Sequence, residues 1–399
     1  MVLRKNMRWL TLGALLAVGV VVGAFYTFRP STDERYRFQI RTPIPGADSD
    51  IRSAIYQSLG TRMLPGHTVT WLNNGQVFDA VEQSVRAAKT SIHMLLYIWE
   101  EGAASNRITD AVIGRAKEGV ECRILVDAFG SSAFGKTVQP QLTAAGCDVR
   151  IFRPLAGGAK LSRNHRKIVV VDGVTAVTGG FGIRDSWLGD GVNNDGWRDA
   201  NVLFSGPAVT EAQQAFAENW QEAGGALLPE GAFPPLANSG GAEACFVAST
   251  NSTTVTRAER LTQLLIAAAK RRLWISNAYV VPSSAILQML KQKASEGVDV
   301  RLLAPGKKSD SKTSFGLQHT QYGSLLKHGV RIWEYQPSML HSKTMLVDER
   351  IVVVGSINLD PLSLNKLEEG ALVVSDEIFA GQLARAFQTD CTHSRELTK

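Results

Sequence analysis

The chain has 399 residues, 44% of them hydrophobic and 20% charged, with a formal net charge of +6 and a pI near 9.1. This composition is that of a globular protein, and the length argues against a single ordinary core, so we expect two domains or two halves. The mildly basic balance suits an anionic partner, either phospholipid or nucleic acid, without choosing between them.

The four cysteines contain no CxxC pair, which argues against a cysteine-based zinc site. We expect them to be buried thiols. A disulfide between Cys122 and Cys147 is the alternative if the domain lies outside the cytoplasm.

Residues 9–28 carry no charge and follow Arg4, Lys5 and Arg8. Twenty residues at ~1.5 Å per residue span a bilayer as a helix, so residues 1–30 are predicted to be a membrane anchor. The preceding basic cluster predicts a cytoplasmic N-terminus, with most of the chain on the other side of the membrane. A signal peptide cleaved after Ala24 is the competing interpretation.

Four segments then recur in the same order, which indicates an internal duplication. Residues 80–99 match 261–281, 116–126 match 294–304, 144–154 match 327–337, and a segment containing HxKxxxxD closes each unit. The alternation of helices with short apolar strands predicts α/β layers around a mostly parallel or mixed sheet. We place the first domain at residues 31–235 and the second at 236–399, joined by the Pro- and Gly-rich stretch 227–244.

The repeated motif places His165 beside Lys167 and His341 beside Lys343, each pair running into an apolar strand. Residues two apart on a strand share a face, so each pair presents an imidazole and an ammonium together. If the halves pack about a pseudo-twofold axis, one histidine can attack phosphorus while the other protonates the departing oxygen and the lysines neutralise phosphate oxygens. Lysines are poor metal ligands, so we expect no metal and no cofactor.

Other residues fit a phosphate site of this kind. Asn358 in "GSIN" can donate its amide to a phosphate oxygen, whereas Gly182 stands at the matching place of the first half. A nucleophilic histidine also needs a carboxylate on its other nitrogen. Asp199 and Glu369 follow the histidines of their own halves by 34 and 28 residues, and Glu368 is an alternative to Glu369.

Asp172 and Asp348 complete the two motifs and belong to the predicted catalytic set. Because each ends its strand, we expect its side chain to hold a turn or bind backbone rather than touch substrate.

With these residues assembled, the chain resembles the phospholipase D superfamily, whose signature is the pair of HxKxxxxD motifs, from about residue 66 to residue 390. Segments such as "RNHRKIVVVDG", "GWRDANVLFSGPAV" and "YQPSMLHSKTMLVD" are most similar to its bacterial cardiolipin synthase branch. The resemblance implies a duplicated α/β/α sandwich with one active site between its halves, and a covalent phosphohistidine formed without metal. It favours His165 as the nucleophile, Lys167, Lys343 and Asn358 as phosphate ligands, and Asp199 and Glu369 as orienting residues.

The function that the resemblance implies is transfer of a phosphatidyl group from phosphatidylglycerol to a second lipid, at a bacterial inner membrane and on its extracytoplasmic side. Hydrolysis of the same lipids to phosphatidic acid needs the same residues, and sequence cannot distinguish the two. A membrane-tethered nuclease is a further alternative, although the chain lacks a dense basic stripe with interleaved aromatic residues. A binding module without chemistry is disfavoured because all six motif residues are present.

Overall fold

A computed structural model describes residues 40, 44–46, 50–155, 162–193, 196–252 and 254–398. The predicted anchor at residues 9–28 lies outside this part of the chain. Within the described residues, no helix is both long and apolar enough to cross a membrane.

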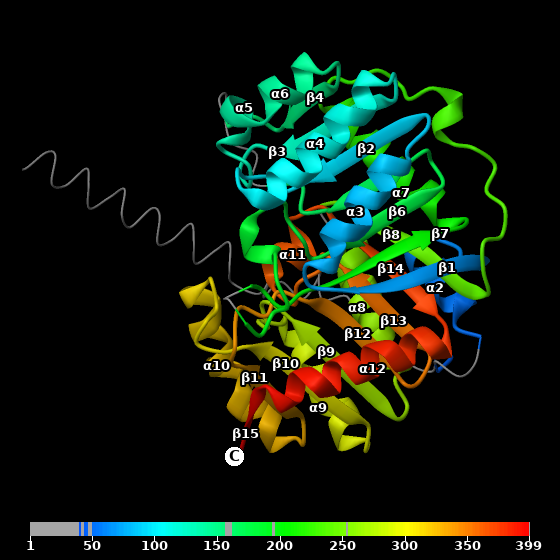
Figure 1. Ribbon diagram of the computed structural model, residues 1–399. Helices are drawn as coiled ribbons and strands as arrows, with labels where there is room; N and C mark the ends of the chain where they lie inside the picture. Colours follow the sequence, from blue (N-terminus) through cyan, green and yellow to red (C-terminus); the bar gives the residue numbers. More distant parts are fainter. Residues whose placement is uncertain are drawn as a thin grey trace, which may run out of the picture.

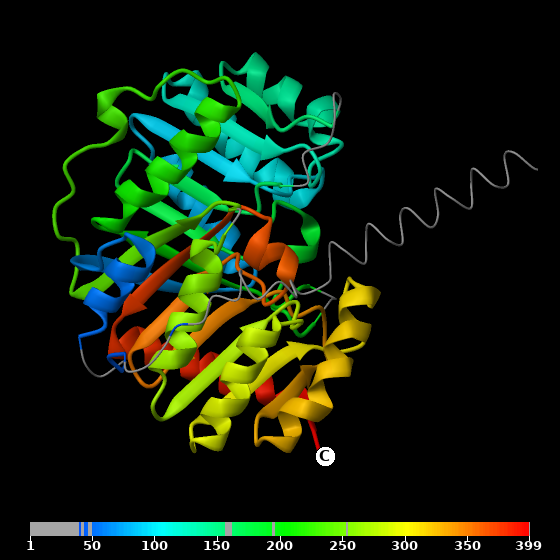
Figure 2. The ribbon, with the colours of Figure 1, turned by 180° about the vertical axis from the view of Figure 1, so that it is seen from behind.

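The described chain forms one mixed sheet of 15 strands with helices on both faces. In Figure 1, α3, α4 and α12 lie in front of the sheet, and Figure 2 shows α7, α8 and α9 on the opposite face. The first half contains β1 (Leu64–Asn73), α3 (Gln76–Ala87), β2 (Ser91–Leu96), α4 (Ala103–Lys117), β3 (Glu121–Asp127), α5 (Phe134–Thr137), α6 (Gln139–Ala144), β4 (Asp148–Phe152), β5 (Ile168–Val171), β6 (Thr175–Gly179), η2 (Asp185–Trp187), β7 (Ala200–Ser205), α7 (Ala208–Glu222) and η3 (Glu230–Ala232).

The second half repeats this arrangement. It contains β8 (Ala242–Ser249), α8 (Arg257–Ala268), β9 (Arg272–Asn277), α9 (Ser284–Ser295), β10 (Asp299–Pro305), α10 (Lys312–Lys327), β11 (Arg331–Tyr335), β12 (Lys343–Val347), β13 (Ile351–Gly355), α11 (Pro361–Asn365), β14 (Glu369–Ser375), α12 (Glu377–Thr392) and β15 (Ser394–Leu397).

The strand order confirms the duplication. The first half runs β1-β7-β6-β5-β2-β3-β4 and the second runs β8-β14-β13-β12-β9-β10-β11, with β15 added at the outer edge. The two halves join through the antiparallel pair of β1 and β8. In each half the strands that follow the crossover helices pair in parallel, and the strand after each HxK pair is antiparallel to its neighbours.

Glycines end the matching helices at the places where the repeats predict. Gly119 after α4 and Gly297 after α9 have φ values of 91° and 89°, a backbone conformation that other L-residues adopt only with strain. The chain therefore turns directly into β3 and β10, which are parallel to β2 and β9. The carboxyl ends of these strands meet at one edge of each half, where the HxK segments also begin.

One helix packs outside its expected domain. Ile55 and Leu59 of α2 (Arg52–Leu59) are buried in the core of the second half, together with Leu261 and Leu265 of α8. The order of elements along the chain does not reveal this contact. The division between residues 235 and 236 lies in the connection between α7 and β8 and stays a prediction.

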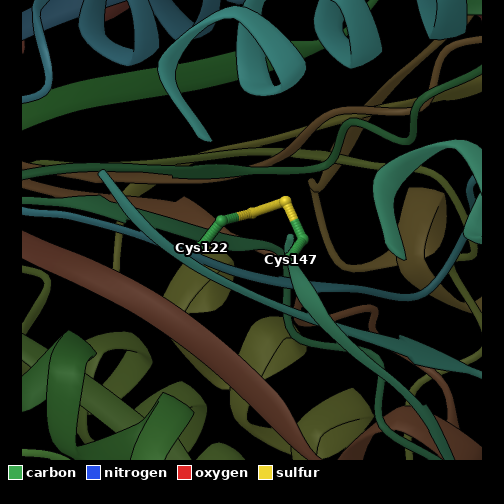
Figure 3. Close-up of a disulfide and its surroundings, with 2 residues drawn as sticks. All are labelled: Cys122 and Cys147. Carbon is green, nitrogen blue, oxygen red and sulfur yellow. A yellow bond between two sulfur atoms is a disulfide. The ribbon is translucent and has the colours of Figure 1, made fainter. Parts of the chain in front are cut away.

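Cys122 of β3 and Cys147, which directly precedes β4, form a disulfide across neighbouring strands (Figure 3). The expectation of buried thiols is therefore wrong for this pair, although both residues are buried. The register explains the pairing, because Arg123 and Asp148 are partners in the parallel ladder and so bring the preceding cysteines together. Cys245 is a buried free thiol, as expected.

Candidate active site

Each HxK segment is paired through its backbone with a segment of the other half. The amide of His165 donates to the carbonyl of Glu368 at 2.8 Å, and the amide of Glu368 donates to Arg163 at 2.9 Å. The second motif repeats this pattern, since His341 donates to Arg198 at 2.7 Å and Arg198 donates to Met339 at 2.9 Å. These two short ladders bring both motifs into one site between the halves.

The orienting carboxylates are exchanged between the halves. Nδ1 of His165 lies 3.0 and 3.1 Å from the two carboxylate oxygens of Glu369, and Nδ1 of His341 lies 3.1 Å from Oδ2 of Asp199. Chain spacing had placed each carboxylate after the histidine of its own half, and that pairing is wrong. The backbone ladders explain the exchange, because Glu369 follows the partner of His165 and Asp199 follows the partner of His341.

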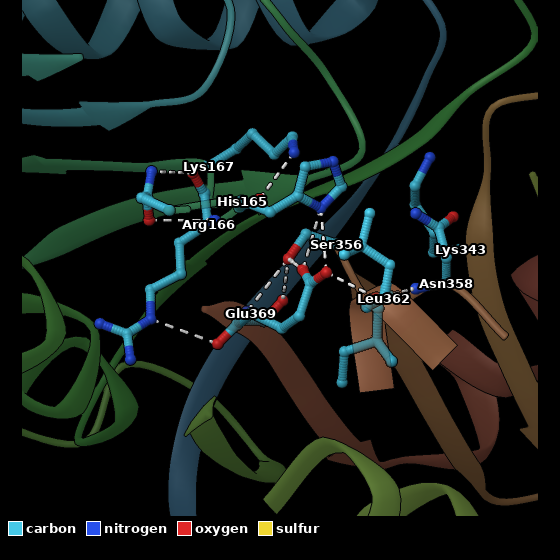
Figure 4. A network of polar contacts seen from close by, with 12 residues as sticks. His165, Arg166, Lys167, Lys343, Ser356, Asn358, Leu362 and Glu369 are labelled. Carbon is cyan, nitrogen blue, oxygen red and sulfur yellow. Dashed lines mark hydrogen bonds and ion pairs between the residues drawn. The ribbon is translucent and has the colours of Figure 1, made fainter. Parts of the chain in front are cut away.

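Two hydroxyl groups hold Glu369 in place, and Figure 4 shows Ser356, which provides one of them. Ser356 Oγ donates to one carboxylate oxygen, and Ser363 Oγ donates to the other at 2.5 Å. With Nδ1 committed to the carboxylate, the Nε2 of His165 is left for chemistry. Sequence reasoning did not single out either serine, although Ser356 lies within the "GSIN" segment.

Glu368, the alternative to Glu369, is directed away from the histidine. Its carboxylate forms an ion pair with Arg153 and accepts a hydrogen bond from Asn219 Nδ2 at 2.5 Å. Neighbouring residues on an extended segment point to opposite faces, so only one of the two glutamates can reach His165. The contacts identify Glu369.

Aromatic side chains support the second histidine. Trp187 Nε1 donates to Asp199 Oδ2 at 2.7 Å, and the indole rings of Trp187 and Trp197 lie 5.1 and 5.2 Å from the His341 ring. The Asp199 carboxylate also accepts from the amide of Ala200 at 2.7 Å. Trp187 ends η2 and Trp197 lies in the loop that follows, and the sequence did not reveal the role of either.

The motif lysines are almost fully buried beside their histidines. Lys167 Nζ donates to the carbonyl of His165 at 2.6 Å and lies 5.3 Å from the centre of the Tyr97 ring. Lys343 Nζ donates to the carbonyl of His341 and lies 2.9 Å from its Nδ1. Burial lowers the pKa of Lys167 to about 7 and that of Lys343 to about 8, although nearby carboxylates oppose the change.

Lys343 also acts across the contact between the halves, since its charge further lowers the pKa of Lys167 and of His165. For both histidines burial is the largest effect, and it brings the pKa of His341 to about 4. Burial is the largest effect on the pKa values of Asp199 and Glu369 and raises them, but the bound histidines, the neighbouring lysines and further hydrogen bonds together leave both pKa values below their usual range. Neutral imidazoles thus face ionised carboxylates, and a bound phosphate anion would raise the pKa values of the histidines and lysines.

Asn358 lies in the same site, and Figure 4 shows it with Lys343. Its side chain is buried, and among the described residues its Oδ1 has no hydrogen-bond partner. Gly182, its counterpart, has no room for an amide, because a Cβ there would lie 2.9 Å from Cβ of Ile98 and 3.1 Å from Trp187. Only the second half can therefore supply this amide.

The motif aspartates lie at the far ends of their strands. The Asp172 carboxylate accepts from the amides of Lys89, Thr90 and Ser91 at 2.7–3.1 Å. Asp348 accepts from the amides of residues 270–272 at 2.8–3.3 Å. Both contacts fasten the loop before the neighbouring strand, as the strand-end position predicts. Their place among catalytic residues is therefore corrected to a structural one.

Within the described residues, no group of three or more His, Cys, Asp or Glu side chains is arranged to hold a metal ion. The prediction of metal-independent chemistry rests on the sequence argument alone.

Comparison with known proteins identifies the family of the chain. The family described as "Cardiolipin synthase, PLD-like domain" matches residues 81–220 and 263–391. The chain is 30% identical over 380 residues to Cardiolipin synthase 1 of Bacillus anthracis, which covers 91% of this chain and 74% of the relative. It is 34% identical over 352 residues to Cardiolipin synthase A of Pseudomonas aeruginosa, covering 86% of this chain and 71% of the relative.

Among solved structures, phosphatidylserine synthase of Haemophilus influenzae superposes with a TM-score of 0.66 at 14% identity, covering 87% of this chain and 92% of that one. Polyphosphate kinase of Porphyromonas gingivalis gives a TM-score of 0.56 at 10% identity, covering 90% and 52%. At these identities the superpositions establish the shared fold.

Proposed function

Because the chain belongs to the family of phospholipase D-like cardiolipin synthase domains, we propose that it is a phosphatidyltransferase that makes cardiolipin from two molecules of phosphatidylglycerol. The donor loses glycerol, and the second molecule provides the accepting hydroxyl. The observation that carries the proposal is that each of the two histidines is bound at Nδ1 by a carboxylate of the opposite half and lies beside a buried lysine.

In the first step, Nε2 of His165 attacks phosphorus, and the bond from phosphorus to the glycerol oxygen breaks. Glu369 holds Nδ1–H and stabilises the cation that forms on the ring. His341 supplies a proton to the departing oxygen, and the negative phosphate raises the pKa of His341 so that it can carry that proton. Lys167, Lys343 and Asn358 bind the phosphate oxygens.

In the second step, a hydroxyl of the second phosphatidylglycerol gives its proton to His341 and attacks phosphorus. The phosphorus–nitrogen bond breaks, cardiolipin leaves, and His165 returns to its neutral form. Each histidine ends the cycle as it began, so the reaction consumes no co-reactant.

The test supplies purified protein with phosphatidylglycerol vesicles and identifies the products in wild type and in His165→Asn and His341→Asn. Wild type is expected to form cardiolipin. His165→Asn should form no product and no protein-bound phosphate, while loss of the acid–base group in His341→Asn should slow turnover by roughly 10²–10⁴-fold. A wild type that yields neither cardiolipin nor phosphatidic acid would exclude the proposal.

Hydrolysis remains the second candidate function, because it differs only in whether water reaches the phosphohistidine. The specific observation is the burial of both histidines, whose side chains are only 10% and 7% exposed, and this favours transfer. The ratio of cardiolipin to phosphatidic acid separates the two. Cleavage of DNA with no turnover of lipid would instead favour a nuclease.

The proposed membrane placement rests on the anchor at residues 9–28 and on the edge of the sheet where the site opens. Phe129 after β3, Leu155 after β4 and Leu317 of α10 are 64%, 47% and 37% exposed. Figures 1 and 2 show α5 and α10 on the same side of the molecule.

The Cys122–Cys147 disulfide favours an oxidising compartment, hence the extracytoplasmic side. Protease digestion of intact spheroplasts tests this, since a domain on the cytoplasmic side would survive.

A further inference from the structure

A tyrosine and an aspartate lie at the edge of the site on the side of the second half. Tyr279 comes two residues after Asn277, the last residue of β9, which is paired with Lys343 of β12. Its neighbour Val280 bridges to Leu359, next to Asn358. The backbone pairing therefore places Tyr279 beside both predicted phosphate ligands of the second half.

Tyr279 presents its hydroxyl group to an exposed carboxylate. Its Oη lies 3.0 Å from each carboxylate oxygen of Asp310, which follows the carboxyl end of β10. Burial and the Asp310 charge both raise the pKa of Tyr279, so the hydroxyl stays protonated and donates. The carboxylate keeps further lone pairs for other donors, because two oxygens offer about four acceptor positions.

Asp310 is close enough to the reacting groups to affect them. Burial lowers the pKa of His341 and of Lys343, and the Asp310 charge acts in the opposite direction on both. In the proposed mechanism, His341 protonates the leaving oxygen. Asp310 therefore lies on the side where the head group departs.

The matching positions of the first half carry no such pair. The strand pairing shows which residues of the two halves correspond. Leu95 of β2 is paired with Ile168, and Ser276 of β9 is paired with the equivalent residue Thr344, so Leu95 corresponds to Ser276. Three residues further along each chain segment, Ile98 corresponds to Tyr279. In the same alignment Ser132 takes the place of Asp310. On the first side Tyr97 lies against His165 and Lys167, and a serine stands at the Asp310 position. The second side adds an exposed carboxylate bound to a phenol, so the two sides offer different groups to a substrate.

We propose that Tyr279 and Asp310 form the subsite for a polyol head group, which accepts hydrogen bonds from the glycerol hydroxyls of phosphatidylglycerol. The inference rests on the proposed function and specifies its substrate class. Leaving and attacking oxygens occupy the same apical position on phosphorus in the two steps. The subsite therefore holds first the departing glycerol and then the glycerol of the second lipid, whose hydroxyl passes its proton to His341 as it attacks.

The experiment measures which acceptor takes the phosphatidyl group. Wild type, Asp310→Ala, Asp310→Asn and Tyr279→Phe receive phosphatidylglycerol vesicles with equal concentrations of radiolabelled glycerol and ethanol. The readouts are labelled phosphatidylglycerol against phosphatidylethanol, and cardiolipin against phosphatidic acid. Ser132→Ala is the matched control, because Ser132 is the exposed counterpart of Asp310 in the other half.

Removing a hydrogen bond to a charged group should lower the preference for glycerol over ethanol by about tenfold or more in both Asp310 variants. The cardiolipin fraction should fall with it, Tyr279→Phe should show a smaller effect in the same direction, and the control should match wild type. Because Asp310 is exposed, both Asp310 variants are expected to fold. If thermal melting shows that they are unfolded, the acceptor ratio of Tyr279→Phe decides whether the subsite exists.

Unchanged acceptor ratios in folded variants would overturn the subsite, even if total turnover falls, because a merely electrostatic effect on His341 slows all acceptors alike. A wild type with no turnover of phosphatidylglycerol would remove the proposed function and the subsite together. Normal turnover with unchanged ratios would remove the subsite alone.

Discussion

Glu369 of the second half binds Nδ1 of His165 in the first half at 3.0 Å, and Asp199 of the first half binds His341 in return. Neither half alone contains a histidine with its orienting carboxylate. The short backbone ladders that produce this exchange are part of the contact between the halves. Formation of the site is thus tied to docking of the halves.

Glu369→Gln should disturb His165 and leave His341 nearly unchanged. Glu369 raises the pKa of His165, so its loss should lower that pKa and weaken the preference for the tautomer with Nδ1–H. Nitrogen-15 NMR of the imidazoles, recorded across pH, measures both effects. We also expect a fall in kcat of roughly 10–100-fold, the usual effect of removing an orienting partner.

Asp199→Asn is the matched control for this experiment, because it should move the His341 resonances instead. A Glu369→Gln spectrum in which His341 shifts and His165 does not would contradict the crosswise pairing.

Binding of an anionic substrate analogue should weaken as pH rises from 7 to 9. In the empty site the pKa values of Lys167 and Lys343 are about 7 and about 8, so each ammonium is present below its value and is lost above it. A phosphonate monoester keeps one negative charge over this range and needs both lysines to be protonated. Its affinity should fall by about tenfold between pH 7 and pH 8, where one proton is lost, and by about a hundredfold per pH unit above pH 8, where both are lost.

Calorimetry in buffers of different ionisation enthalpy should show proton uptake on binding in the same range. Lys167→Gln should bind weakly at every pH and show less uptake. Constant affinity from pH 6 to 9 would mean that both lysines remain charged in the empty site.

The repeated motif and the alternation of helices and strands were sufficient to predict the duplicated α/β sandwich and both HxK pairs. The same reasoning failed for the carboxylates, because spacing along the chain orders residues within one half, whereas Glu369 and Asp199 act across the contact between halves. Trp187 and Ser363 were missed for a related reason. An indole in a short 3₁₀ helix or a hydroxyl in a short helix carries no signal in the sequence, and only the fold shows that it contacts a carboxylate bound to a motif histidine.

Gly182→Asn should destabilise the protein rather than add a second phosphate ligand. A Cβ at this position meets Ile98 at 2.9 Å and Trp187 at 3.1 Å, and overpacking of this kind costs about 1–3 kcal/mol. Denaturant unfolding measures the loss. The added variant Ile98→Ala in the same chain should recover part of it by making room for the amide.

Gly114→Asn is the matched control, since nothing lies within 4 Å of a Cβ there. Because Asn has a slightly better helix propensity than Gly, this variant should be as stable as wild type or slightly more stable. Equal stability of Gly182→Asn and wild type would show that Ile98 and Trp187 move aside easily.

Asn358→Ala should weaken phosphate binding without unfolding the site. Only the second half supplies an amide here, and the buried Oδ1 has no partner among the described residues, so little internal bonding is lost. We expect the affinity for the phosphonate to fall by about tenfold, the value of one hydrogen bond to a charged group. The melting temperature should stay near that of wild type, and a large fall in melting with unchanged affinity would make Asn358 a structural residue.

Reduction of the Cys122–Cys147 disulfide should destabilise the first half. The bond joins β3 to β4 across a sequence separation of 25 residues, and closing a loop of this length stabilises a protein by about 2–4 kcal/mol in the chain-entropy treatment. Cys122→Ser with Cys147→Ser should lower the unfolding midpoint and remove its sensitivity to reductant. Cys245→Ser, at a buried free thiol, is the control and should keep that sensitivity. If wild type unfolds identically with and without reductant, the bond is absent from the protein, and the argument from it for an extracytoplasmic domain no longer holds.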